Sequence, residues 1–146
     1  MKGKPATAGI TRVNRAATRP LRGLEYYCRD LNGWPRSWMV QEKDLPSGEK
    51  LVACLRPFLE ELAASDLSPK TIQKHVDNAW TLGGEIITHL NENPSLRRKP
   101  IQQILDDRID DEGGPLVYAM ESEELLQRSF DATCRKLRAF LRNQSR

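Results

Sequence analysis

The sequence lacks the features that mark exported, membrane-spanning or metal-dependent proteins. It has no long apolar run, its mean hydropathy is -0.62 and 29% of its residues are charged, so we expect neither a signal peptide nor a membrane span, and a cytoplasmic location. Cys28, Cys54 and Cys134 form no C-x-x-C pair, which favours free thiols over a zinc or redox site. His75 and His89 would lie about 21 Å apart on one helix, too far to share a metal ion. We therefore expect neither metal nor cofactor.

Catalytic motifs and strand patterns are also missing. The sequence contains no P-loop, no G-x-G-x-x-G, no H-E-x-x-H and no nucleophile elbow, and we predict a protein that is not an enzyme and has no catalytic residues. No segment alternates polar and apolar residues for long enough to predict a strand. With 146 residues, the composition indicates an all-α fold, a compact bundle of four to five helices. We assign residues 24–146 to one helical domain and residues 1–23 to a flexible basic arm.

The strongest helix signal runs from Leu67 to Leu90. Ser68 is a suitable N-cap and Pro69 suits the first helical position. The apolar residues that follow recur at helical spacing and share one face: Ile72, Val76, Ala79, Trp80, Gly83, Ile86, Ile87 and Leu90. Glycine is unfavourable in a helix by about 1 kcal/mol relative to alanine unless space is limiting, so Gly83 predicts the crossing point of another helix.

The opening of this helix, Ser68-Pro69-Lys70-Thr71-Ile72, resembles the S-x-x-T-[IL] pattern of the N-terminal core-binding domain of tyrosine recombinases and phage integrases. That domain is a small helical SAM-like DNA-binding module in which a short apolar helix precedes the central one. The resemblance covers roughly residues 48–90, and more loosely residues 122–141. It implies DNA contact at the start of the central helix by Lys70, Thr71, Lys74 and His75. The catalytic H-x-x-R and nucleophilic tyrosine of that family are absent.

The preceding helix is predicted over Leu51–Leu62, with Ser47 as its cap. Pro57 lies within it and predicts a kink or two abutting short helices near Arg56. Before it, the segment from Leu24 to Val40 is rich in aromatic residues. These side chains could stack on bases, or they could cover the helical core as a lid.

Basic residues gather at both ends of the chain, where no acidic residue accompanies them in residues 1–23 or 132–146. The arm could bind phosphates or could simply be a frayed end.

The last helix is predicted from Glu123 to Arg142 with Ser122 as its cap. Its apolar positions are Leu126, Phe130, Thr133, Leu137, Phe140 and Leu141. On the opposite face lies an arginine ridge, defined as Arg128, Arg135, Arg138 and Arg142, with Lys136 nearby. The ridge could contact DNA, or its arginines could pair with Asp131.

Another helix is predicted to begin at Pro100 and to continue to the stop signal at Gly113, with an acidic outer face. A solvated helix face, a mimic of DNA and a dock for a basic partner are all compatible with this pattern. The residues that such a protein partner would contact are Asp106, Asp107, Asp110 and Asp111.

We therefore expect a non-catalytic protein that binds double-stranded DNA, resembles a free-standing integrase core-binding domain and is accessory to recombination or regulation on a mobile element. The candidate nucleic-acid-binding residues are Lys70, Thr71, Lys74, His75, Arg128, Arg135, Lys136, Arg138 and Arg142. The alternative is a small adaptor, or an inhibitor of a nucleoprotein complex, that docks through its acidic helix or its aromatic segment.

Overall fold

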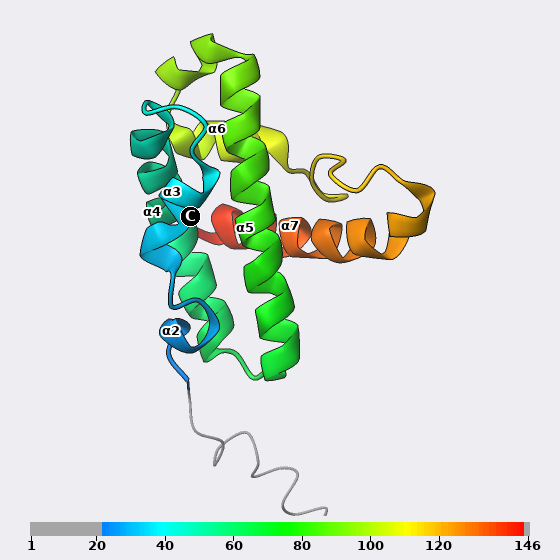
Figure 1. Ribbon diagram of the computed structural model, residues 1–146. Helices are drawn as coiled ribbons and strands as arrows, with labels where there is room; N and C mark the ends of the chain where they lie inside the picture. The colour runs from blue at the N-terminus through cyan, green and yellow to red at the C-terminus, as the bar shows by residue number, and fades with distance from the viewer. Residues whose placement is uncertain (1–21, 145–146) are drawn as a thin grey trace, which may run out of the picture.

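The computed structural model describes residues 22–144, so most of the predicted arm lies outside the described residues. The described part folds into helices and turns without a strand, which confirms the all-α class (Figure 1). Its helices are α2 (Leu24–Tyr27), η1 (Leu31–Gly33), α3 (Trp34–Trp38), α4 (Asp44–Ala64), α5 (Pro69–Glu92), η2 (Pro94–Arg98), α6 (Ile101–Arg108), η3 (Glu121–Glu123) and α7 (Glu124–Gln144).

Helix α5 is the centre of the structure, as predicted. Ser68 caps it, because its side-chain oxygen accepts a hydrogen bond from the Thr71 N–H at 3.2 Å. The predicted apolar stripe is buried, with two differences: Trp80 is 42% exposed, and Leu82 is buried in its place. Trp80 instead donates its indole N–H to Ser37 of the aromatic segment.

Helix α4 packs against α5 along most of its length, with the short turn at residues 65–68 between them (Figure 1). Helix α4 is continuous from Asp44 to Ala64, so of the two outcomes predicted at Pro57 the division into two short helices is wrong. The helix also begins before the predicted cap at Ser47. Pro57 and Ala53 are both exposed. Water can therefore satisfy the Ala53 carbonyl that proline leaves without its helical partner.

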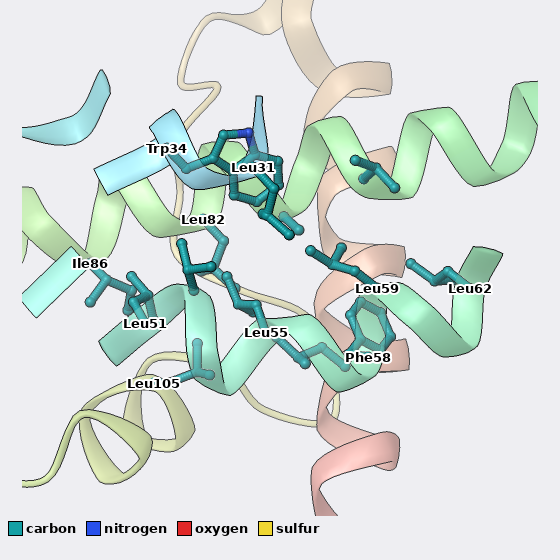
Figure 2. Packing of buried hydrophobic residues seen from close by; sticks show 14 of the residues in the cluster. Leu31, Trp34, Leu51, Leu55, Phe58, Leu59, Leu62, Leu82, Ile86 and Leu105 are labelled. Carbon is teal, nitrogen blue, oxygen red and sulfur yellow. The ribbon is translucent and has the colours of Figure 1, made fainter. Parts of the chain in front are cut away.

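The core is built mainly by these two helices. In Figure 2, Leu51 and Leu55 of α4 lie near Leu82 and Ile86 of α5, and Leu105 of α6 closes one side. Phe58 and Leu59 lie toward α7, where the ring of Phe58 packs 5.7 Å from that of Phe140. Leu31 and Trp34, from the aromatic segment, close the other side. Of the two interpretations of that segment, the structure therefore supports a lid: Tyr27, Trp34 and Trp38 are buried, although Tyr26 remains 53% exposed and Met39 and Val40 at its end are also exposed.

Gly83 is a packing position, but the neighbour is not the one predicted. A Cβ atom at Gly83 would lie 2.7 Å from Cε2 of Trp38, so the buried indole of α3, and not another helix backbone, occupies the space beside the glycine. The Trp38 Nε1–H also donates to the Trp80 carbonyl at 3.0 Å. Glycine at position 83 thus allows the lid to seat its tryptophan on α5.

Helix α7 crosses α5, and its first half extends beyond the α4–α5 pair (Figure 1). The predicted cap at Ser122 is wrong, because Ser122 lies inside η3. Most of the predicted stripe is buried, but Leu126 is 51% exposed, because this part of α7 extends past its neighbours.

Helix α6 ends at Arg108 instead of continuing to Gly113, and Ile109 takes up an extended conformation that buries its side chain.

Candidate nucleic-acid interface

Buried polar side chains fix the crossing of α5 and α7. The Asn78 side-chain amide donates to Oγ1 of Thr133 at 2.9 Å and to Oγ and the carbonyl of Ser129 at 3.1 and 3.2 Å. Nδ1 of His75 lies 2.7 Å from the same Thr133 hydroxyl. A buried amide is costly unless its hydrogen bonds are made, so this network favours one register of α7 on α5. Asn78 was not anticipated from the sequence, in which it only borders the apolar stripe.

His75 therefore belongs to the junction. Burial, followed by the charges of Lys136 and Lys74, lowers the pKa of His75. The ring is consequently neutral at pH 7 and serves as a hydrogen-bond partner of Thr133. Lys74 of α5 and Lys136 of α7 both lie near enough to His75 for their charges to act on it.

Lys70, Lys74 and Lys136 are exposed on this face. Within the described residues, none of the three is held in an ion pair. Lys70 and Lys74 also line a groove of about 450 Å³, together with Asp77 and the exposed side chains of Leu125 and Leu126. Thr71 is half-buried, and its hydroxyl bonds to Ser68 at 2.9 Å. The structure thus brings together the predicted residues at the start of α5 and Lys136 of α7.

The arginine ridge is arranged differently. Arg138 is only 21% exposed in its side chain: its Nε–H donates to Asp111 at 3.0 Å and one terminal nitrogen donates to the Ile109 carbonyl at 2.9 Å. Arg142 lies 3.5 Å from the same Asp111 carboxylate, and Arg135 donates to the Glu112 carbonyl at 3.1 Å. Three members of the ridge therefore hold the acidic segment, defined as residues 106–112, which covers the end of α6 and the turn after it. This pairing joins two oppositely charged patches that are separate in the sequence.

Arg128, the fourth member, pairs with Glu124 at 2.6 Å on an exposed helical turn. The pairing with Asp131 expected from helical spacing is replaced by other contacts, since Asp131 accepts from the Gly114 N–H at 3.1 Å and the Gln127 side chain at 2.9 Å. These bonds fix the chain that leads into α7.

The acidic segment combines paired and exposed carboxylates. Asp111 holds two arginines, and Asp110 accepts from the N–H groups of Glu112 and Gly113 at 2.8 and 3.0 Å, which forms a tight turn. Asp106 and Asp107 are exposed. In the part of the chain that the structure describes, no group of three or more His, Cys, Asp or Glu side chains is arranged to hold a metal ion.

A second buried polar cluster lies at the opposite end of α5. Asp44 is completely buried and contacts Arg97 at 2.8 Å, the Asn91 side chain, and the N–H groups of Val40 and Gln41 at 3.0 Å. Burial by itself would raise the pKa of Asp44, but these hydrogen bonds outweigh it and the pKa is lowered. The cluster ties the start of α4 to the end of α5 and to η2. No sequence motif marks these residues as partners.

Comparisons with known proteins add no assignment: no protein-family model, curated protein or solved structure matches this chain. None of the described helices combines the length and the apolar character that crossing a membrane requires.

Proposed function

We propose that this chain is a non-catalytic protein that binds double-stranded DNA through the face where the start of α5 meets α7. The observation that carries the proposal is that Lys70, Lys74 and Lys136 are exposed and form no ion pair among the described residues, while Lys74 of α5 and Lys136 of α7 both act on His75 at the crossing of the two helices. Cations that are not neutralised within the protein can replace the counterions of a phosphate backbone, and the release of those counterions drives binding.

The N-terminus of α5 adds to this surface. A long helix carries a partial positive charge at its N-terminus, which attracts anions. At α5 the Thr71 N–H is already bonded to Ser68 and Pro69 has no N–H, so the terminus contributes mainly through this charge. Lys70 and Lys74 lie in the first two turns of this helix, so their ammonium groups and the helix terminus would act on the same phosphate strand. The lysines would position the duplex without reading its sequence.

The arginine ridge has a smaller place in this proposal than its sequence pattern suggests. Arg138 is committed to Asp111 and to the carbonyl after α6, so it serves mainly to hold the acidic segment. Arg135 and Arg142 are exposed and could reach DNA at the edge of the surface. The nearby Asp111 would reduce their attraction for phosphate.

The resemblance of residues 68–72 to the core-binding domain of integrases is consistent with this placement, because that family uses the start of the same helix for DNA. A role accessory to recombination or regulation on a mobile element, in which another protein supplies strand cleavage, is part of the proposal.

The test compares two charge reversals of equal size in a titration of labelled duplex at several salt concentrations. Lys70→Glu with Lys74→Glu changes the proposed face, whereas Lys43→Glu with Lys50→Glu changes exposed lysines at the other end of the α4–α5 pair. We expect the first variant to bind all duplexes more weakly and to flatten the salt dependence by about one unit for each phosphate that it no longer neutralises. We expect the second variant to bind almost as the wild type does. Equal reductions in affinity in both variants, or no binding by the wild type at low salt, would refute the proposal.

A second candidate function is supported by a separate feature. Four large apolar side chains are exposed on and before the protruding half of α7: Leu116, Met120, Leu125 and Leu126. An exposed apolar patch on a small protein commonly marks a protein interface. An adaptor or an inhibitor of a nucleoprotein complex would bind its partner here, and the acidic segment with Asp106 and Asp107 would attract a basic partner. Partner binding that survives high salt and is abolished in Leu125→Ser would support this function over DNA binding.

A further inference from the structure

A pocket of about 370 Å³ lies between the aromatic segment and the first half of α5. The residues that line it include three aromatic ones, Tyr27, Trp34 and Trp80, and two acidic ones, Asp30 and Asp77. Trp80 is the exposed ring among the three, whereas Tyr27 and Trp34 are buried behind it. Among the described residues, no lysine or arginine lines it. This combination of aromatic and acidic walls differs from the cationic face at the start of α5.

Hydrogen bonds hold the aromatic walls in place. The Trp80 Nε1–H donates to Oγ of Ser37 at 2.9 Å, and that hydroxyl donates to the Trp34 carbonyl at 2.7 Å. Trp34 itself is fixed in the core beside Leu31 (Figure 2). Trp80 is nevertheless 42% exposed, so a large apolar ring is held rigidly at the mouth of the pocket while remaining accessible to a ligand. Preorganised walls of this kind reduce the entropy lost on binding.

The carboxylates are also held at the pocket. The Gln73 side-chain amide donates to the Tyr27 carbonyl and to Oδ1 of Asp77, both at 2.9 Å, which fixes Asp77 beside the aromatic segment. Burial first, then the charge of Asp30, and more weakly that of Asp77, raise the pKa of Cys28 to about 11. Both carboxylates therefore act on one thiol in the wall of the pocket. Arg56 opposes them from a separate pocket that Cys28 also lines.

We propose that this pocket binds an organic ammonium cation, either a free quaternary amine or the methylated ammonium group of a lysine side chain. The faces of tryptophan and tyrosine rings are electron-rich and attract a cation that is too weakly hydrated to prefer water. Asp30 and Asp77 supply the opposite charge, and the apolar ring surfaces accommodate the methyl groups. An anionic ligand would be repelled by both carboxylates. Asp77 also lines the groove that contains Lys70 and Lys74, so the cation site borders the proposed DNA-binding face but selects a ligand of the opposite charge.

The first test uses choline as the probe, with binding followed by the NMR shift of the Trp80 indole N–H. The uncharged analogue of choline, in which a quaternary carbon replaces the nitrogen, is the matched ligand. We expect choline to shift the Trp80 signal saturably and the analogue to bind at least about tenfold more weakly, because it lacks the cation–π and ionic attraction. Equal affinity for the two ligands, or no saturable shift with choline or with a trimethyllysine peptide, would overturn the proposal.

Variants locate the site. Trp80→Ala should weaken binding of choline, measured by calorimetry, about 3- to 30-fold. Tyr26→Ala, which removes an exposed aromatic ring outside the pocket, should leave it unchanged. Asp77→Asn preserves the shape and should weaken choline binding by about threefold or more, with the exposed Asp66→Asn as its control. Equal effects in the pocket and control variants would overturn the assignment.

The two sources of the cation are distinguished by a peptide that carries one trimethyllysine. Tighter binding of this peptide than of choline, abolished when the lysine is unmethylated, would assign the pocket to a modified protein partner. Affinity for choline equal to or greater than that for the peptide would assign it to a free amine. Either result supports a cation site.

Discussion

The two adjacent glycines of α5 lead to opposite predictions for the same substitution. At Gly83, a Cβ atom would lie 2.7 Å from Cε2 of Trp38 and 2.5 Å from Cη2, well inside van der Waals contact with a buried, hydrogen-bonded ring. At Gly84, the nearest atom to a Cβ would be Cδ1 of Trp38 at 3.4 Å, an ordinary contact. Both positions gain about 1 kcal/mol of helix propensity when glycine becomes alanine.

The magnitudes follow from these distances. Overpacking at Gly83 should cost about 1–3 kcal/mol, and displacement of Trp38 from the Trp80 carbonyl about 1 kcal/mol more. These costs exceed the gain in propensity, so Gly83→Ala should lower the free energy of unfolding by about 1–3 kcal/mol, and Gly83→Leu by more. Gly84→Ala meets no such clash and should be neutral or stabilising by up to about 1 kcal/mol.

The assay is denaturant unfolding of the wild type and the two alanine variants, monitored by circular dichroism. The dependence of the free energy of unfolding on denaturant concentration should be the same in all three proteins, as two-state unfolding to similar denatured states requires. The double variant Gly83→Ala with Trp38→Leu provides the specific control. The smaller side chain relieves the clash, so the two substitutions should be less harmful together than their sum. The reasoning fails if Gly83→Ala is as stable as the wild type, if both alanine variants are equally destabilised, or if the double variant shows simple additivity.

Three further predictions concern the polar contacts. Asp44→Asn should lower the free energy of unfolding by about 3–5 kcal/mol, because it leaves the largely buried Arg97 without its counter-charge; a change below about 1 kcal/mol in chemical denaturation would contradict this role. The pKa of His75 is lower in the folded chain than in the unfolded chain, so the unfolded chain binds the proton more readily. The contribution of His75 to stability should therefore be full above about pH 6.5 and be lost as the pH falls through the lower pKa of the folded state. His75→Gln should flatten this pH dependence of the free energy of unfolding, measured by denaturation between about pH 7 and 5, and an unchanged pH dependence would argue against the role of His75. Arg138→Ala should lower the free energy of unfolding by about 1–3 kcal/mol, since it removes an ion pair and a hydrogen bond to the Ile109 carbonyl. Arg128→Ala removes only an exposed ion pair and should cost about 0–1 kcal/mol. Equal decreases in melting temperature in the two variants would show that Arg138 is not structural.

Helical periodicity determined the fold class and the buried faces of the principal helices. It placed α5 almost to the residue, because the cap at Ser68 and the apolar spacing are local signals that need no partner. It also located most of the buried face of α7. The division into two short helices, one of the two outcomes predicted at Pro57, did not occur, since a proline whose missing hydrogen bond faces water need not interrupt a helix that is held by packing.

Only the tertiary structure decided which charges remain available at the surface. The arginine ridge and the acidic segment are separate charge runs in the sequence, yet Arg138 and Arg142 meet Asp111 in the fold, while Lys70, Lys74 and Lys136 remain without ion pairs among the described residues. The pairing depends on the path of the chain between α6 and α7, and a side chain's spacing along its own helix carries no information about that path. The same holds for the pocket beside Trp80, because its aromatic and acidic walls come from segments that are far apart in the chain and meet where the lid packs on α5.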